Sequence, residues 1–260
     1  MVCVHSDPAW PTRCARFHGE HCSDGRYEAG AYAAGYRILD ALNMVAYLFA
    51  ALLLPMFSAA SASEGQQRKL LDEGFRYMWL LVIPLSVLCV VRSREIITFL
   101  YSEATDQWAL VFAVLILGFI LMGMMYVFGT FLTAMGRVGT MNLLFLGTVV
   151  LNVILNLILI PRYKALGAAI ATLVTQFCAV LGIMVICSRL LPPRVSAKYG
   201  LRTAGFTVFA IGACLVLSSY TNLPLIAFAS VYGVLIISLG FLFRLIRWKE
   251  LTSMIKTGDQ

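Results

Sequence analysis

The chain has 260 residues, of which 60% are apolar and only 13% are charged. Because a soluble globular domain averages about 25% charged residues, this composition excludes an ordinary soluble protein and indicates a protein embedded in lipid. The net charge of +7 does not indicate nucleic-acid binding, because the basic residues are spread over many loops, as expected beside membrane spans.

Apolar runs recur along the chain at the length that a helix needs to cross a hydrocarbon core, about 20 residues. We therefore predict an all-α fold, a polytopic transmembrane helical bundle of about seven spans. The short amphipathic piece 93–104 (SREIITFLYSEA) follows the second span, and we expect it to lie at the interface. Pro84 is expected to kink the second span. In chain order the predicted spans are Ala31–Ser58, Phe75–Val91, Trp108–Met135, Thr140–Ile160, Leu166–Leu190, Thr203–Ser219 and Leu223–Phe243.

These spans divide the chain into parts of different character. Residues 1–28 form a head that holds Cys, His, Pro and charges instead of an apolar run, and we expect it to be disordered or non-native. Residues 29–190 hold five predicted transmembrane helices and residues 191–245 hold two more. Residues 246–260 form a basic, amphipathic tail.

The distribution of Lys and Arg orients the bundle. The segments that follow the first, third, fifth and seventh spans carry most of these residues, whereas the other side holds only Arg92, Arg94, Arg162 and Lys164. Because cytoplasmic loops carry the excess of positive charge, we predict that the C-terminus lies in the cytoplasm. The first span then begins outside, and the head contains no span that would bring the chain across. We therefore expect that preceding helices are missing or that the head is translocated unaided.

Four stretches carry a resemblance to a known family. They are 29–58 (AGAYAAGYRILDALNMVAYLFAALLLPMFS), 94–104 (REIITFLYSEA), 131–142 (FLTAMGRVGTMN) and 152–177 (NVILNLILIPRYKALGAAIATLVTQF). In this order and spacing they resemble the C-terminal lobe of the polysaccharide-export branch of the multidrug/oligosaccharidyl-lipid/polysaccharide flippase superfamily, the Wzx-type oligosaccharide flippases.

The resemblance implies a fold and a function. Members have two pseudosymmetric lobes with about twelve to fourteen helices around a central cavity, and they work by alternating access. The implied function is the flipping of a lipid-diphosphate-linked oligosaccharide in the plasma membrane for surface polysaccharide biosynthesis, driven by an ion gradient. This chain would supply the C-terminal lobe without its first helix, so a missing N-terminal lobe is an expected partner besides the bilayer and the lipid-linked substrate.

Two alternatives remain open. The chain could be a lobe of a multidrug-type cation antiporter, but that function needs carboxylates in the cavity, and the third to seventh predicted spans hold none. It could also be a membrane fragment or scaffold that transports nothing.

The candidate residues for a substrate cavity begin in the first span. Arg37 and Asp40 are charged residues placed within the first predicted span, and a charge inside the membrane by default suggests function. A guanidinium suits a diphosphate because Arg makes bidentate, charge-assisted contacts with phosphate. In the alternative interpretation Arg37 snorkels to the outer interface and pairs with Asp40 at i+3. Tyr32 and Tyr36, one turn apart, would either stack on sugar or belong to an interfacial aromatic belt.

Asn152 and Asn156 are the remaining cavity candidates. Their i, i+4 spacing puts both amides on one helix face, where they would hydrogen-bond to a neighbouring helix or to sugar hydroxyls; we favour the structural role. Gly167, Ala171 and Thr175 form a ridge of small residues that favours close helix packing.

No pattern indicates enzymatic chemistry. The sequence has no phosphate-binding Gly-Lys-Ser/Thr loop, and its carboxylates are too few for paired acid–base work. We predict no enzyme activity, no cofactor and no metal. The paired spacings of zinc sites are also missing from the head residues Cys3, His5, Cys14, His18, His21 and Cys22.

Overall fold

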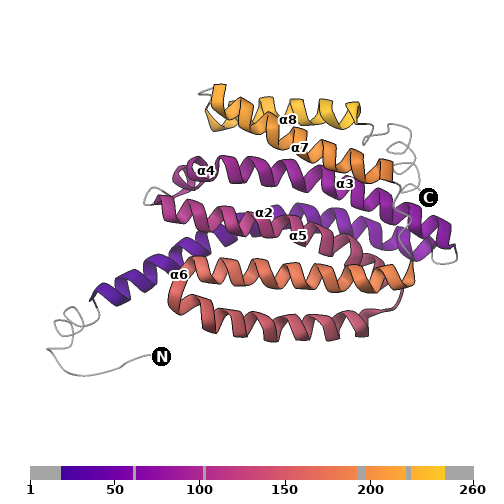
Figure 1. Ribbon diagram of the computed structural model, residues 1–260, viewed down its shortest axis with the longest axis horizontal. Coiled ribbons are helices and arrows are strands. Elements are labelled where there is room, and N and C mark those ends of the chain that lie inside the picture. The colour runs from indigo at the N-terminus through magenta and orange to yellow at the C-terminus, as the bar shows by residue number, and fades with distance from the viewer. Residues whose placement is uncertain (1–18, 61–62, 102–103, 192–196, 221–223, 244–260) are drawn as a thin grey trace.

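The computed structural model describes residues 19–60, 63–101, 104–191, 197–220 and 224–243, and for 19–26 and 197–200 it describes the backbone alone. All regular structure within these residues is helical, which confirms the all-α prediction (Figure 1). The helices are α2 (Gly19–Ala59), α3 (Glu64–Val91), α4 (Ser93–Leu100), α5 (Asp106–Ala134), α6 (Val138–Leu190), α7 (Ala197–Tyr220) and α8 (Leu225–Leu242).

Six of the helices in the described part of the chain are long and apolar enough to cross a membrane. The exception is α4, whose eight residues are too short to cross. The longest helix, α6, has 53 residues and folds back on itself at Lys164, whose backbone angles of φ 51° and ψ −128° are not helical. Its two antiparallel arms (Figure 1) correspond to the fourth and fifth predicted spans.

The fold of α6 follows from its sequence. Pro161 lacks a backbone N–H, so it removes one helical hydrogen bond in the last turn before the fold at Lys164. Gly167 then lets the two arms approach closely, because a Cβ at this position would lie 2.4 Å from the carbonyl oxygen of Leu159. The arms are further joined by Leu144 of the first arm, whose side chain lies over Gly182 of the second.

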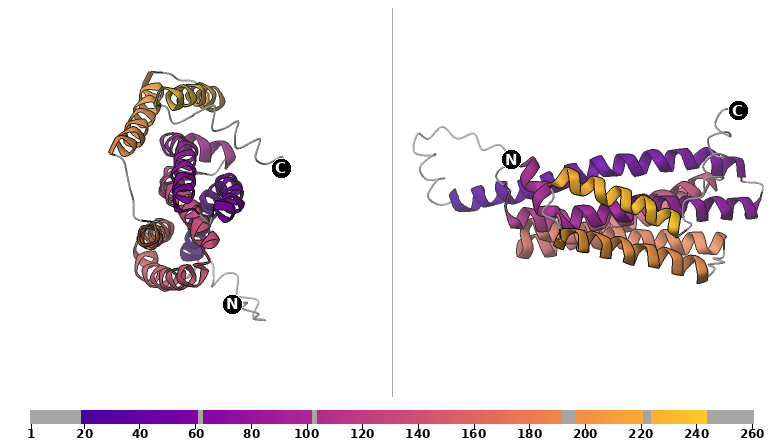
Figure 2. Two further views of the ribbon diagram at one scale, coloured as in Figure 1. Left: turned by 90° about the vertical axis from the view of Figure 1, so that its right-hand side faces the viewer. Right: turned by 90° about the horizontal axis from the view of Figure 1, so that it is seen from above.

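The centre of the bundle is α5. It contacts α2, α3, α4 and α6, and the end-on view in Figure 2 shows it between α2, α3 and α6. Helix α5 has no charged residue after Asp106 and is apolar on all sides, as a membrane span requires. Its fully buried side chains include Val111, Phe112, Ile116, Phe119, Val127 and Phe131.

The pair α7–α8 forms a second, smaller core. Phe206, Cys214, Phe228 and Tyr232 are buried between these helices, and the pair packs against α3. The indole Nε1 of Trp79 on α3 donates a hydrogen bond of 3.0 Å to a threonine hydroxyl on α7. The last two predicted spans therefore pack beyond α3, at a distance from the α6 hairpin (Figure 2).

Helix starts differ from the predicted span limits where the chain is polar. Helix α3 begins at Glu64, whereas the predicted span begins at Phe75. The first turns of α3 are charged and lie outside any apolar run, so the hydropathy pattern did not include them. Helix α2 begins at Gly19, so the predicted limit of the head at residue 28 falls inside it. In Figure 1 the first turns of α2 extend beyond the other helices. Residues 1–18 and the predicted tail 246–260 lie outside the described residues.

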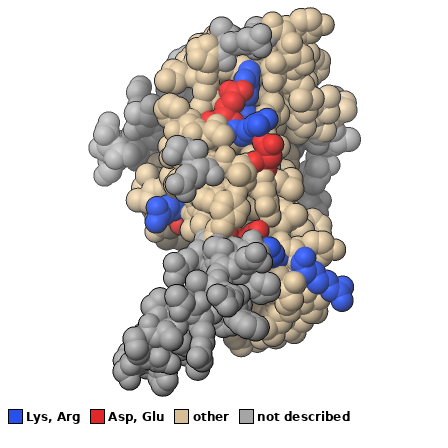
Figure 3. Space-filling view, turned by 90° about the vertical axis from the view of Figure 1, so that its left-hand side faces the viewer, with Lys and Arg blue, Asp and Glu red and all other residues tan. Residues whose placement is uncertain are grey.

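Different connections between helices lie at the two ends of the bundle. The end with α4 also holds the fold of α6 and the start of α8, and the opposite end holds the connections from α2 to α3 and from α5 to α6 (Figure 1). Basic and acidic side chains lie next to each other on the α4 end, as Figure 3 shows. Arg94 Nε there lies 2.8 Å from an Asp106 carboxylate oxygen.

Candidate functional site

A stripe of polar and aromatic side chains runs along α2. It consists of Tyr32, Tyr36, Asp40, Asn43 and Tyr47, and intervals of three and four residues put these side chains on one helix face. We call this set the polar stripe. Only its first three members were predicted as site residues. The spacing that links all five was present in the sequence and is the signal by which the other two could have been found.

The N-terminal part of the polar stripe, at Tyr32 and Tyr36, joins α2 to α6. The rings of Tyr32 and Tyr36 are stacked, with centroids 5.6 Å apart and planes at 26°. The Tyr32 hydroxyl lies 3.3 Å from Thr172 Oγ1. Because Thr172 already donates its own hydroxyl proton to the Ala168 carbonyl oxygen, Tyr32 is the donor in this contact.

Arg37 and Asp40 are both exposed on α2. The predicted ion pair between them is not formed, since no pair of their charged atoms within the described structure lies within 4.0 Å. The Asp40 carboxylate instead lies within electrostatic reach of the hydroxyls of Tyr36 and Tyr126. The guanidinium of Arg37 is therefore accessible for an anionic ligand.

The C-terminal part of the polar stripe, at Asn43 and Tyr47, contacts α5. Asn43 is buried, and its Nδ2 donates to the sulfur of Met122 at 3.0 Å. Its Oδ1 is also buried and has no hydrogen-bond partner. The ring of Tyr47 meets the ring of Tyr126 edge to face, with centroids 6.0 Å apart and planes at 68°. Sequence reasoning missed Tyr126 because no pattern within α5 shows which helix it faces.

The amides of Asn152 and Asn156 lie inside the α6 hairpin. Asn156 Nδ2 donates to Asn152 Oδ1 at 2.8 Å, and Asn152 Nδ2 donates across to Thr175 Oγ1 at 3.1 Å. Thr175 in turn donates to the carbonyl oxygen of Ala171 at 2.6 Å. These bonds join the two arms. The structure thus places the two amides in contact with the other arm and not with the polar stripe.

Glu28, in the segment predicted as a disordered head, binds three helices together. Its buried carboxylate accepts a hydrogen bond of 3.0 Å from Gln107 Nε2 on α5 and one of 3.2 Å from the backbone N–H of Ala165. Ala165 begins the second arm of α6, where backbone N–H groups lack helical partners. The hydropathy pattern does not distinguish Glu28 from other polar residues that precede a span, so its role could not be predicted from the sequence.

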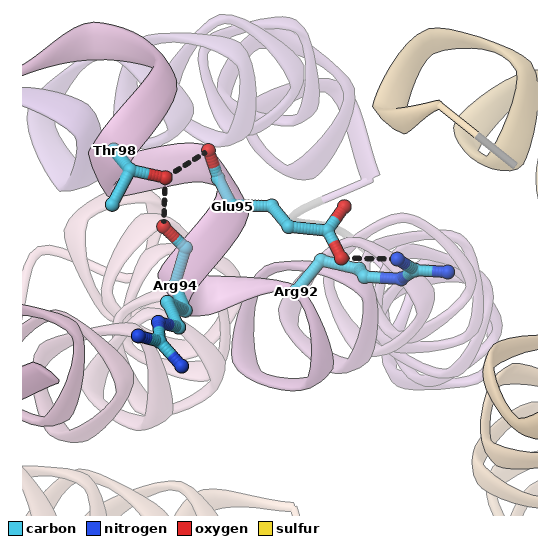
Figure 4. Close-up of polar contacts among 4 residues, drawn as sticks. All are labelled: Arg92, Arg94, Glu95 and Thr98. Atoms are coloured by element: carbon cyan, nitrogen blue, oxygen red, sulfur yellow. Dashed lines mark hydrogen bonds and ion pairs between the residues drawn. The ribbon is translucent and has the colours of Figure 1, made fainter. Parts of the chain in front are cut away.

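A second charged cluster lies where α3 meets α4. Arg92 Nη1 binds the Glu95 carboxylate, and the Thr98 hydroxyl donates to the carbonyl oxygen of Arg94 at 2.8 Å (Figure 4). The Arg92 guanidinium carbon also lies 4.1 Å from the centre of the Phe228 ring on α8. This cluster connects α8 to the end of α3 and lies apart from the polar stripe on α2.

No group of three or more metal-ligating His, Cys, Asp or Glu side chains occurs among the residues that the structure describes. The Cys and His residues of the predicted head lie outside the side chains described. The prediction of no metal and no cofactor therefore stays a prediction.

Fold and polar stripe together define a polytopic helical membrane protein with polar groups inside its spans. Residues 31–236 match the family described as Lipid II flippase MurJ, and the chain belongs to this family. A solved structure, "Lipid II flippase MurJ, inward closed conformation", is 17% identical in sequence and superposes with a TM-score of 0.65. The match covers 85% of this chain and 48% of that chain, so this chain spans about half the length of that protein. A comparison with curated protein sequences finds no match.

These comparisons confirm the predicted flippase superfamily. They do so through the lipid II flippase family. Membership of the polysaccharide-export branch stays a prediction.

Proposed function

We propose that this chain forms one lobe of a plasma-membrane flippase for a lipid-diphosphate-linked glycan. The observation that carries the proposal is the exposed pair Arg37 and Asp40 on a membrane-spanning helix, beside the stacked rings of Tyr32 and Tyr36. Charges inside a membrane are costly, so they face a polar cavity or a polar cargo and not lipid. Family membership supports the same class of function.

Each of these residues fits one part of such a cargo. The free guanidinium of Arg37 would hold the diphosphate through bidentate hydrogen bonds. The tyrosine rings would contact the sugar that follows the diphosphate. The lipid tail would stay in the bilayer, beside the apolar faces of the spans. Alternating access between two lobes would then carry the headgroup across.

The second lobe is part of the proposal. The related structure is about twice as long as the part that this chain matches, and we propose that a further lobe, on another chain or another segment, faces α2 across the cavity that holds the cargo. The positive-inside distribution supports a cytoplasmic C-terminus. The family description favours the precursor lipid II as cargo, and the predicted branch favours an oligosaccharide for surface polysaccharide.

Complementation separates these cargoes. The chain is expressed, alone and with a candidate partner lobe, in cells depleted of their lipid II flippase and in cells lacking their surface-polysaccharide flippase. Restored growth in the first strain identifies a cell-wall precursor, and restored surface polymer in the second identifies an oligosaccharide. Failure in both strains, with the protein present in the membrane, refutes transport and leaves the scaffold alternative.

Substitution of Arg37 tests the site itself. Arg37→Ala is expected to lower transport about tenfold or more, the size of one lost charge-assisted hydrogen-bond contact, and Arg37→Lys is expected to retain part of the activity. Arg137→Ala serves as the control, since Arg137 is also an exposed arginine and lies at the α5–α6 connection. Unchanged transport in Arg37→Ala would place Arg37 at the interface as a snorkelling side chain.

A further inference from the structure

The exposed side of α2 carries a regular row of side chains. Starting at Ala33 and alternating intervals of four and three residues, every position up to Ser58 is exposed. We call this row the α2 seam; it consists of Ala33, Arg37, Asp40, Met44, Tyr47, Ala51, Leu54 and Ser58. A repeat of 3.5 residues keeps such a row facing a second helix along its whole length. In the end-on view of Figure 2, α2 lies at the side of the bundle, where a second helix can approach it.

Two charges in the α2 seam lack a partner within the fold. Arg37 and Asp40 are exposed, and neither forms an ion pair in the part of the chain that the structure describes. Ionisable residues within membrane spans pair with other charges or face a polar cavity. Because the seam carries one cation and one anion, a surface that pairs with it must also present one anion and one cation, at matching heights.

A second copy of the same chain presents this pattern. In a two-fold symmetric contact, residue i meets residue j and residue j meets residue i, so Arg37 of each copy would meet Asp40 of the other. Both copies carry the same distribution of Lys and Arg and are expected to share one orientation in the membrane, so their α2 helices would run parallel. Arg37 and Asp40 then differ in height by about 4.5 Å, three residues at 1.5 Å each, a distance that an arginine side chain spans.

We propose that a second copy of this chain supplies the second lobe, and that the two copies meet along their α2 seams when no cargo is bound. The inference rests on the proposed function and names its partner. The small side chains of Ala33 and Ala51 let two backbones approach closely, and Met44, which is 63% exposed, packs between them. In this closed state Asp40 of one copy holds Arg37 of the other. A cargo diphosphate then competes with that carboxylate for Arg37, and its binding opens the cavity between the two seams.

Charge exchange between the two copies tests the pairing. Full-length chains that carry a donor or an acceptor fluorophore at the C-terminus are reconstituted in liposomes, and energy transfer between them measures association. Arg37→Asp puts two anions in each seam and Asp40→Arg puts two cations there, so each variant alone should associate about tenfold more weakly or worse, as expected when a buried ion pair is broken. A one-to-one mixture of the two variants should regain energy transfer, because an anionic seam then meets a cationic one.

Arg137→Asp is the matched control, because it reverses the charge of an exposed arginine outside the α2 seam; it should leave energy transfer within about twofold of the wild type, the range of an exposed charge. A wild-type chain without energy transfer would overturn the second copy. Undiminished transfer in Arg37→Asp and Asp40→Arg, or no recovery in their mixture, would overturn it as well.

The complementation strains separate this inference from the proposed function. Transport by a chain that shows no energy transfer in the same membrane would overturn the inference alone and leave the proposed function with a different partner lobe. Energy transfer with the expected response to charge exchange, but no restoration of either strain, would support the pairing of the seams and refute transport.

Discussion

Removal of the Glu28 carboxylate is expected to destabilise the whole bundle. The carboxylate is buried and accepts hydrogen bonds from Gln107 Nε2 and from the backbone N–H of Ala165. Hydrogen bonds to a charged group contribute about 1.5–3 kcal/mol each, and an anion at a helix N-terminus adds about 0.3–1 kcal/mol. Glu28→Ala should therefore cost about 3–7 kcal/mol, and Glu28→Gln less, because its amide oxygen still accepts one bond.

The chain contains its own reporters for this measurement. Cys89, Cys187 and Cys214 are buried free thiols, so a thiol-reactive dye detects unfolding as each becomes accessible. For a chain of this size about 1 kcal/mol lowers Tm by roughly 2–4 °C, so Glu28→Ala should melt about 6–28 °C below the wild type. Glu64→Ala, at an exposed carboxylate in the first turn of α3, is the control. A Tm for Glu28→Ala equal to that of the control would refute the assignment of Glu28 as a buried three-helix contact.

Two further substitutions test the packing of the membrane helices. Gly167→Ala should destabilise the α6 hairpin by about 1–3 kcal/mol, because the new Cβ would meet a backbone carbonyl of the other arm. Gly147→Ala is the control, since a Cβ there would have no atom within 4 Å. Equal melting temperatures for the two variants would contradict the close approach of the arms. Phe228→Ala should lower the free energy of unfolding by about 3–5 kcal/mol, mainly for the pair α7–α8. Cys214 should then react with the dye at a lower temperature than Cys187. Reaction of both thiols at the same temperature would contradict a separate second core.

The sequence was sufficient for the spans and for the α6 hairpin. Uncharged runs, the Pro-Arg-Tyr-Lys turn at 161–164 and the polar segment before Trp108 are local features, so they are visible without tertiary information. The short helix α4 begins at Ser93, where the predicted interfacial piece begins. The same local reasoning failed at Gly19, because the first turns of α2 are polar and helix formation there does not depend on an apolar run.

The candidate site was only partly predictable, because a contact depends on two helices and a pattern describes one. Tyr32 and Tyr36 were found from their own spacing, but their position opposite Thr172 was not. Asn43 was not predicted, and its contact with Met122 depends on a second helix, α5. The i+3 spacing of Arg37 and Asp40 suggested an ion pair, whereas the structure leaves the two groups apart.

The centre of the bundle was the hardest feature to predict, for a reason specific to membranes. In water an apolar face marks the core, but in lipid an apolar face is equally suited to the core and to the acyl chains. Helix α5 and the first arm of α6 are both apolar, yet Phe112 and Phe119 on α5 are fully buried while Leu143 and Leu157 on α6 are more than two-thirds exposed, at 71% and 72%. Only polar groups break this equivalence, because lipid does not tolerate them. The polar stripe on α2 therefore carries the information about function that the apolar helices lack.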